Sequence, residues 1–205
     1  VFFFVERADV NAKWKTSMTV AGLVTGIAFW HYLRMSDMNA AGEVTTVYRY
    51  VDWLITVPLQ IVEFYLILLA VTAVSSGLFW RLLSASLVML IFGFLGEAGL
   101  MDSTIAFIPG MAGWLYILYE IFSGEAASLS SNSKNPGGQF AFNSLRIIVT
   151  AGWAIYPVGY FMGYLAGGTD MDTVNIIYNV ADLVNKTAFG LAIWAGARMD
   201  TAGNK

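Results

Sequence analysis

The sequence predicts an all-α membrane protein, a bundle of seven transmembrane helices whose first helix is truncated in this chain. Of the 205 residues, 58% are hydrophobic and only 12% are charged, whereas a soluble domain usually has about 25% charged residues. A spanning helix needs about 20 mostly apolar residues, and six stretches of this kind follow one another along the chain. The sequence shows no strand-like alternation of polar and apolar residues, so a membrane β-barrel is not expected.

The predicted elements begin with a stub and continue as six spans separated by short loops. Residues 1–5 are apolar but too few to cross a bilayer, and we expect them to be the end of the first helix. The six spans are predicted at residues 16–33, 44–74, 82–96 with an extension to 101, 103–119, 147–169 and 173–197. Loops are predicted at 6–13, 34–43, 75–77, 123–138 and 167–172, and we expect one domain over residues 1–205.

Several functions are excluded by residues that the chain lacks. It has no cysteine, which excludes a disulfide framework, a zinc finger and a thiol nucleophile. Its single histidine, His31, excludes a multi-histidine metal site, so we expect no metal. The net charge is −3 without any basic block, and nucleic acid is therefore not an expected partner. The expected surroundings are a lipid bilayer.

Basic residues near the ends of the spans predict the orientation. Successive loops of a membrane bundle lie on alternate sides of the membrane. Counted in this way, eight basic residues fall on one side of the membrane and only Arg34 falls on the other. Because basic residues concentrate in cytoplasmic loops, we expect the first side, which carries the C-terminus, to be cytoplasmic. The protein is thus expected to be a multi-pass protein of the cell (inner) membrane. The eight residues are Arg7, Lys13, Lys15, Arg81, Lys134, Arg146, Arg198 and Lys205.

The span at 44–74 carries a stripe of polar residues. Arg49, Asp52, Thr56, Gln60 and Glu63 are spaced by 3, 4, 4 and 3 residues, which places them on one face of a helix. A polar seam that only holds helices together is one interpretation. Two carboxylates and an arginine are costly for that purpose inside a membrane, so a functional site is favoured.

The span at 173–197 has a lysine near its centre. Asp182 and Lys186 are four residues apart and can pair along one helix face, so a purely structural ion pair is one interpretation. A lysine at this depth is costly and is suited to Schiff-base chemistry with a carbonyl ligand. Such a buried cation needs counter-ions, for which Asp52 and Asp182 are the candidates. We also expect His31, near the outer end of its span, to pair with Asp52 and tune its protonation.

The span at 147–169 carries an aromatic stripe. Trp153, Tyr156, Tyr160 and Tyr164 are spaced by 3, 4 and 4 residues, and Pro157 among them is expected to kink the helix. Such a stripe is more often packing than the wall of a cofactor site, but a lysine at mid-membrane depth makes a cofactor site the favoured interpretation.

Three further carboxylates lie near span ends, namely Glu97, Asp102 and Glu120. We expect them mainly as interfacial charges, although Glu97 can also face the interior.

Four motifs together resemble the microbial rhodopsins, and among them the proteorhodopsins. They are RYVDWLITVP at 49–58, DLVNK at 182–186, WAIYPVGY at 153–160 and FWHY at 29–32. The resemblance runs from residue 1 to about residue 198, and the lysine of the last helix together with the Asp-Trp segment makes it specific. It implies seven helices around all-trans retinal and a light-driven outward proton pump, which is a transporter rather than an enzyme.

The resemblance also implies roles for individual residues. Lys186 carries retinal as a protonated Schiff base. Asp52 is the primary counter-ion and proton acceptor, with His31 as its partner, and Asp182 is the second counter-ion. Arg49 lies on the extracellular side and organises that half of the proton path.

The same resemblance implies a proton path and a colour. Asp52, Thr56 and Glu63 match the motif of proton-pumping members, with Glu63 as the cytoplasmic donor about 16 Å from Asp52 along a helix. Gln60 stands where family members tune their colour, and glutamine there implies the blue-absorbing variant.

The resemblance also implies a homo-oligomer, a ring of five or six protomers. The other retinal-lining positions are Trp53, Met89, Trp114, Trp153, Tyr156, Pro157 and Tyr178.

Three other functions remain open at this point. A photosensory rhodopsin would share the retinal site and signal to a membrane partner, although Glu63 favours a pump. A retinal-free transporter would use the same buried carboxylates without a chromophore. A structural membrane scaffold explains least, because it gives no reason for the alignment of Arg49, Asp52, Glu63 and Lys186.

Overall fold

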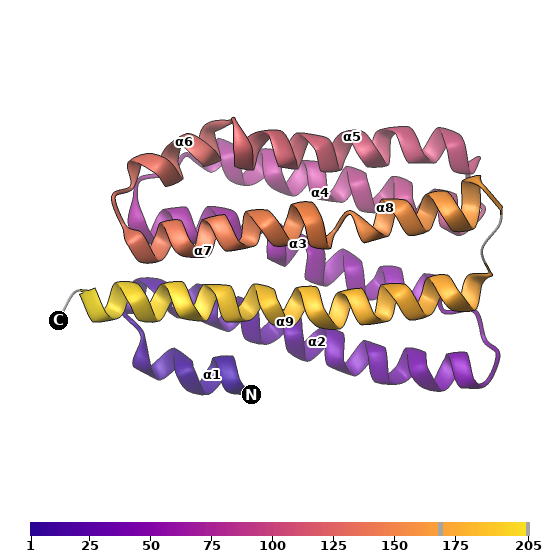
Figure 1. Cartoon of the computed structure of the whole chain (residues 1–205), viewed down its shortest axis with the longest axis horizontal. Coiled ribbons are helices and arrows are strands. Elements are labelled where there is room, and N and C mark those ends of the chain that lie inside the picture. Colours follow the sequence, from indigo (N-terminus) through magenta and orange to yellow (C-terminus); the bar gives the residue numbers. More distant parts are fainter. Residues whose placement is uncertain (168–169, 204–205) are drawn as a thin grey trace.

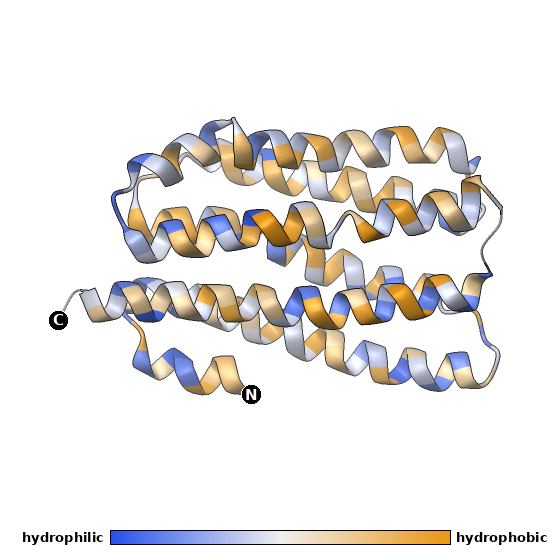
Figure 2. Cartoon of the chain, viewed as in Figure 1, coloured by the Kyte–Doolittle hydropathy of each residue, from blue (hydrophilic) through white to orange (hydrophobic). Residues whose placement is uncertain are grey.

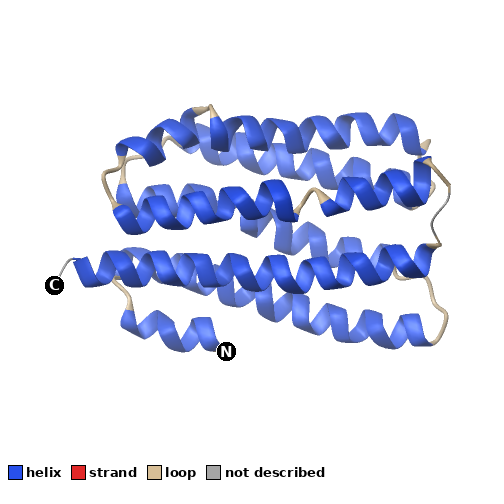
Figure 3. Cartoon of the chain, in the orientation of Figure 1, coloured by secondary structure: helices blue, strands red, loops and turns tan. Residues whose placement is uncertain are grey.

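The computed structural model describes residues 1–167 and 170–203, and in these residues the chain is built of helices and loops without any strand (Figure 3). The long helices run side by side along the long axis of the molecule (Figure 1). The predicted all-α class is confirmed. The α-helices are α1 (Phe2–Glu6), α2 (Lys15–Ala40), α3 (Thr46–Val71), α4 (Ser76–Glu97), α5 (Ser103–Phe122), α6 (Glu125–Asn132), α7 (Pro136–Ile147), α8 (Ile155–Tyr160) and α9 (Met171–Gly203). Short 3₁₀ turns lie at Arg7–Asp9 and Ala12–Trp14, and π-helical segments lie at Ile148–Gly152 and Phe161–Leu165.

The hydropathy of these helices suits a bilayer. Among the described residues, four helical rods are long and apolar enough to cross a membrane, namely Thr46–Val71, Ser76–Glu97, Ser103–Asn132 and Pro136–Leu165. Helices α2 and α9 are 26 and 33 residues long and carry more polar side chains. Figure 2 shows these polar positions scattered along α9 and gathered toward the far end of α2. The six predicted spans therefore correspond to six long helical rods in the described part of the chain.

The stub at the N-terminus is helical and is anchored to the bundle. Helix α1 contacts α2 and α9 and lies at the edge of the bundle (Figure 1). The Phe3 ring is buried and fills the space beside Gly190, where a side chain would collide with it. Trp194 Nε1 of α9 donates a 2.7 Å hydrogen bond to Glu6. Ring packing and this hydrogen bond fix the stub against the last helix.

The rod formed by α7 and α8 is interrupted before Pro157, as the sequence predicts. Proline has no N–H to donate, and its ring crowds the preceding turn. The backbone N–H of Trp153 reaches back five residues to the carbonyl of Ile148 at 3.0 Å, which is π-helical pairing. The result is the irregular stretch between α7 and α8 in Figure 1. The predicted span ended at 169, but residues 168 and 169 lie outside the described residues.

Several helices extend beyond their predicted spans. The loop predicted at 34–43 is wrong in part, because α2 continues to Ala40. The loop predicted at 75–77 is likewise shorter, since α4 begins at Ser76, and α9 runs on to Gly203. The reason is physical: hydropathy marks where a helix leaves the apolar layer, whereas the backbone hydrogen bonds continue through polar residues.

The polar segment predicted as a loop at 123–138 also contains helix. Helix α7 begins at Pro136, and the Asn135 side chain accepts a 2.8 Å hydrogen bond from a backbone N–H of its first turn. Asparagine followed by proline is a recognisable start signal. Helix α6 instead depends on a distant partner, because Arg81 Nη2 of α4 donates to the carboxylate of Glu125 at 2.6 Å.

The loops sort onto two ends of the bundle in the way that the orientation argument requires. The connections from α1 to α2, from α3 to α4 and from α6 to α7 lie at the same end as the C-terminus (Figure 1). The connection from α2 to α3 and the first turn of α9 lie at the opposite end. Of the basic residues counted for the orientation, Lys205 lies outside the described residues.

Candidate functional site

The polar stripe of α3 points into the bundle. The opposite face of this helix, with Val51, Leu54 and Ile55, is 40–44% exposed. Helical periodicity thus separates a polar inner face from an apolar outer face. The five stripe residues are each at most 1% exposed: Arg49, Asp52, Thr56, Gln60 and Glu63.

At the centre of the site, one ammonium group lies between two carboxylates. Lys186 Nζ of α9 donates to Asp52 Oδ2 of α3 at 2.7 Å and to Asp182 Oδ2 at 2.9 Å. The three side chains are 0–5% exposed. Buried charges are tolerated only when they are paired and hydrogen-bonded. The structure therefore brings together the three residues that the sequence singled out on two separate helices.

Asp52 has further partners on α2 and α3. His31 Nδ1 lies 3.1 Å from Asp52 Oδ1, which is the contact expected from the sequence. Thr56 Oγ1 donates to the Asp52 backbone carbonyl at 3.0 Å and lies 3.3 Å from Oδ2. Both carboxylate oxygens are thus contacted by side chains that can hydrogen-bond.

Asp182 is held by two aromatic donors. Trp53 Nε1 of α3 donates to Asp182 Oδ2 at 2.8 Å, and the Tyr156 hydroxyl donates to Oδ1. Tyr178 OH in turn donates to the Tyr156 backbone carbonyl at 3.0 Å.

Asn185 Nδ2 donates to the carbonyl of Gly152 at 3.0 Å, in the irregular segment. The break in the rod formed by α7 and α8 therefore supplies a carbonyl that locks α9 in place.

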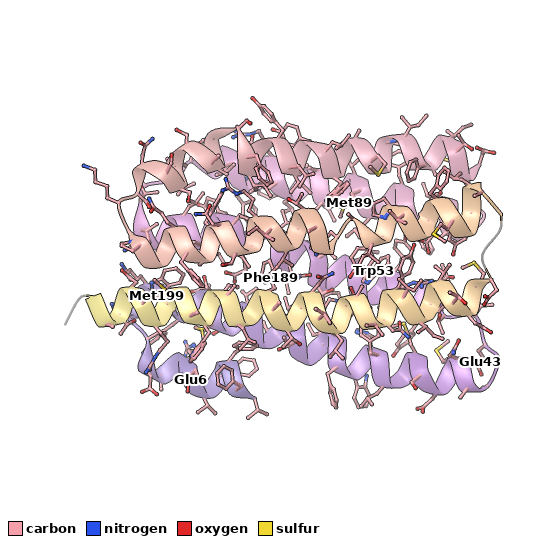
Figure 4. All side chains as sticks on the ribbon, viewed as in Figure 1. Glu6, Glu43, Trp53, Met89, Phe189 and Met199 are labelled. Carbon is pink, nitrogen blue, oxygen red and sulfur yellow. The ribbon has the colours of Figure 1, made fainter. Side chains whose placement is uncertain are left out.

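A largely apolar cavity lies beside Lys186, between α3, α4, α5, α8 and α9. Met89 and Trp53, which contribute to its wall, lie near the middle of the bundle in Figure 4. Apolar and aromatic walls with a few convergent polar groups are typical of cofactor sites. The predicted lining residues that do line it are Trp53, Gln60, Met89, Trp114, Trp153, Tyr156, Pro157 and Lys186.

One predicted lining residue is placed differently, and several lining residues were missed. Tyr178 packs behind the wall, with its ring 5.6 Å from that of Trp53 and 5.5 Å from that of Tyr156. Gly93 and Gly110 line the cavity, and a glycine gives no chemical signal in a sequence. A regular spacing of Gly93 with Gly96 and of Gly110 with Gly113 was the only available hint. The other missed lining residues are Tyr50, Val57, Leu90, Ala106, Phe107, Met111 and Asn185, while Tyr160 of the aromatic stripe and Glu97 also line the cavity.

These residues fit a cofactor that is apolar and reacts through a carbonyl group. An amine, Lys186 Nζ, is available at the wall, and two carboxylates stand ready to balance a positive charge on it. Gln60 Nε2 is buried without a hydrogen-bond partner and belongs to the wall. An unpartnered amide is costly in an apolar setting, which is consistent with a contact that a bound molecule completes.

Glu63 lies farther along the stripe, toward the end that carries the C-terminus. Its side chain is 0% exposed, and neither carboxyl oxygen makes a regular hydrogen bond. Ser17 of α2 is the polar side chain beside it. A carboxyl group in such a setting is best suited to hold a proton.

Arg49 points away from Asp52, toward the opposite end of the bundle. Its Nη1 donates to Asn175 Oδ1 of α9 at 2.8 Å, and its Nη2 lies 3.6 Å from Glu97 Oε2. The guanidinium also lies over the Tyr178 ring, 4.9 Å from the centroid. In the described residues, no ion pair joins Arg49 to Asp52.

Two of the three carboxylates expected at the membrane interface are buried instead. The Glu97 side chain is 2% exposed, so the alternative that it faces the interior is the one observed. Glu120 is 3% exposed and accepts a 2.9 Å hydrogen bond from Arg81 Nε of α4. Asp102 is exposed as expected, and its carboxylate caps α5 by accepting the N–H of Thr104 at 2.9 Å.

Comparison with known proteins agrees with this site. Residues 1–199 match the family model described as bacteriorhodopsin-like protein. The chain is 57% identical over 197 residues to a blue-light absorbing proteorhodopsin of Gamma-proteobacterium Hot 75m4, covering 95% of this chain and 78% of that protein. It is also 57% identical over 196 residues to a green-light absorbing proteorhodopsin of Gamma-proteobacterium EBAC31A08, with the same coverages. The crystal structure of the blue light-absorbing proteorhodopsin from Med12 superposes with a TM-score of 0.82 at 58% identity, covering 100% of this chain and 91% of that one.

Proposed function

Because the chain belongs to the bacteriorhodopsin-like family, we propose that it is a light-driven outward proton pump that carries retinal on Lys186. The observation that supports this most directly is the Lys186 ammonium, 2.7 and 2.9 Å from two buried carboxylates at the wall of an aromatic cavity. Its cofactor is retinal, and its surroundings are a membrane. The protein moves protons rather than converting one compound into another, so it is a transporter.

Lys186 would hold retinal through a Schiff base at Nζ, with Trp53, Trp153 and Tyr156 among the cavity walls that confine it. When bound, retinal supplies the absorption of visible light and an isomerisation that changes the side toward which the Lys186 nitrogen faces. The protein's own part is to hold the ammonium proton, receive it on one side and replace it from the other.

Asp52 accepts the proton that Lys186 Nζ gives up. Its Oδ2 is 2.7 Å from Nζ, within reach for direct transfer. His31 and Thr56 hold the carboxylate in that position. Asp182, held by Trp53 and Tyr156, stays charged and balances the cation.

Glu63 returns a proton to Nζ from the other side. It lies 11 residues beyond Asp52 on α3, which corresponds to about 16 Å along the helix axis. Its buried setting keeps a proton available on the carboxyl group until Nζ requires it. The excess of basic residues at the C-terminal end supports a cytoplasmic C-terminus, so that net transport is outward.

Gln60 supports blue absorption. The blue- and green-absorbing relatives are equally similar to this chain, at 57% identity, so overall similarity does not distinguish the two colours. Gln60 lines the cavity with an unpartnered amide, and a polar group there interacts with charge that moves when light is absorbed.

We further propose a ring of protomers in the inner membrane; the exposed aromatic side chains of Phe29 and Trp30 beside His31 are consistent with a contact there.

The test is the light-induced pH change in an unbuffered suspension of cells that make the protein with retinal. Acidification of the medium that a protonophore abolishes is the expected result. The matched variant Asp52→Asn, which keeps the shape of the side chain, should form a pigment and pump no protons. A coloured parent protein that gives no pH change in light would instead favour a photosensory function, and unchanged pumping by D52N would refute the role of Asp52.

A further inference from the structure

A polar cavity that the proposed proton path does not use lies between α6 and α7, toward the end of the bundle that carries the C-terminus (Figure 1). Its volume is about 290 Å³, whereas one ordered water needs only about 10–15 Å³, so a larger group fits there. The polar side chains that line it are Ser130, Ser131, Gln139, Asn143 and Arg146. Among the described residues, no carboxylate lines this cavity. It therefore combines one positive charge with groups that can hydrogen-bond.

The positive charge of Arg146 has no carboxylate partner in the part of the chain that the structure describes. The carboxylates of this region, Glu120 and Glu125, instead bind Arg81 of α4 at 2.9 and 2.6 Å. The Arg146 guanidinium lies over the Phe122 ring, 4.7 Å from its centroid. This contact holds the guanidinium in place but leaves its donors available, because the ring carries no net charge. An anion is the group that completes such a site.

The surface beside this cavity is apolar and suits the hydrocarbon of a membrane. Arg146 directly precedes the uncharged stretch 147–169, so it stands where the rod of α7 and α8 enters the apolar layer. Phe140 and Ile147 lie three residues before and four residues after Asn143, which places them on one face of α7. They are 42% and 64% exposed. A molecule with an anionic headgroup and hydrocarbon chains therefore matches both the cavity and the face next to it.

We propose that the cavity between α6 and α7 binds the phosphate headgroup of an anionic phospholipid, whose acyl chains lie along the exposed apolar face of α7. Basic pockets between membrane helices are suited to such headgroups. Arg146 binds the phosphate through charge-assisted hydrogen bonds, and Ser130 and Asn143 contribute further polar contacts. A free phosphate ion has the same headgroup chemistry but makes no use of the apolar face, which is why a lipid is the favoured ligand.

The experiment adds dioctanoyl phosphatidylglycerol to the retinal-bound protein in a neutral detergent and counts the bound lipid molecules by native mass spectrometry. The parent protein should bind one phosphatidylglycerol more tightly than any further one. Arg146→Gln should weaken this first binding by about fivefold, the contribution expected of one basic residue at a membrane surface. Dioctanoyl phosphatidylcholine, which has no net charge, should bind weakly to both proteins. An unchanged affinity in R146Q, or equally tight binding of phosphatidylcholine by the parent protein, would overturn the proposal.

Arg198→Gln is the matched control, because it removes the same charge from an exposed position near the C-terminus. The first phosphatidylglycerol should bind R198Q as tightly as the parent protein. An equal loss of affinity in R198Q would mean that the lipid responds only to the overall charge of this end, and it would overturn the site. Inorganic phosphate at the same concentration as the lipid should leave the lipid bound. Displacement of the lipid by that phosphate would overturn the assignment to a phospholipid.

Asn143→Asp tests the same site if R146Q does not fold. Asn143 is exposed, and its side chain makes no hydrogen bond in the described residues, so a side chain of nearly the same shape should be tolerated. The new carboxylate lies three residues before Arg146, where it can pair with the guanidinium and compete with the lipid phosphate. The first phosphatidylglycerol should therefore bind N143D more weakly than the parent protein. Binding of the first lipid with unchanged affinity in N143D would refute the proposal.

Discussion

Replacing Glu63 by glutamine removes the carboxyl group that we expect to return a proton to Lys186. The substitution preserves the shape of the side chain, and neither Glu63 oxygen makes a regular hydrogen bond that it would break. The fold, the pigment and its colour should therefore be unchanged. The reprotonation of Nζ should slow markedly, because the next source of protons is the solution at the C-terminal end of the bundle, beyond a donor site that lies about 16 Å from Asp52 along α3.

The size of the effect follows from what a positioned proton donor contributes. General acid–base groups accelerate proton transfer by about 10²–10⁴-fold. The lower end of this range of acceleration applies here, because Glu63 does not contact Nζ directly and its proton has to travel a distance to reach it. A slowing of about 100-fold corresponds to about 2.7 kcal/mol in the barrier.

The assay is the recovery of the visible absorption after a flash, measured at several pH values. In the parent protein the recovery should change little with pH, since the donor is internal. In E63Q the recovery should be slower by about 100-fold. Its rate should be proportional to the proton concentration, so it decreases as the pH rises. Glu63→Asp, which keeps a carboxyl group, is the control and should recover much faster than E63Q. A recovery in E63Q with the parent rate, or one independent of pH, would refute the role of Glu63 as donor.

Three further outcomes follow from the site. Trp53→Phe removes the 2.8 Å hydrogen bond to buried Asp182 and should lower the stability of the pigment by about 1.5–3 kcal/mol, measured as an earlier loss of colour on heating; an unchanged midpoint would contradict this. Gln60→Leu removes the unpartnered amide at the cavity wall and should shift the absorption maximum to longer wavelength, and a maximum that stays in place would show that Gln60 does not set the colour. Gly110 lines the cavity, and a Cβ there would make only an ordinary 3.6 Å contact with the backbone oxygen of Met89, so the rest of the leucine in Gly110→Leu would fill cavity space and should reduce the yield of pigment from added retinal; full reconstitution would mean that retinal does not occupy this part of the cavity.

Much of the fold was predictable because a membrane simplifies the problem. Every backbone polar group in the apolar layer must be paired within its own helix, so runs of apolar residues gave the helical rods directly. The helix ends were harder to predict. Polar residues 34–40 continue α2, and hydropathy cannot distinguish a helix that leaves the membrane from one that ends. Helix α6 was missed because its first residue, Glu125, is held by Arg81 and Ser75, which are 44 and 50 residues away in the sequence.

The centre of the site was predictable because its residues repeat with the period of a helix. The spacing of Arg49, Asp52, Thr56 and Glu63 fixes their common face before any tertiary contact forms. The spacing of Asp182 and Lys186 fixes their pairing in the same way, and the structure has it at 2.9 Å. Local geometry and the cost of a charge in a membrane thus singled out the stripe as a functional site and Asp52 and Asp182 as counter-ion candidates, whereas the acceptor and donor roles came from the resemblance to the microbial rhodopsins.

The outer half of the site depends on how distant segments meet. Arg49 turns toward Asn175, 126 residues away, and toward Glu97 on α4, and nothing in the spacing of α3 indicates that direction. Glu97 stands at the end of its helix, where a carboxylate is usually solvated, and it is buried because Tyr164 and Arg49 pack over it. A helical period specifies which residues share a face, but the packing of one helix against another settles what that face meets.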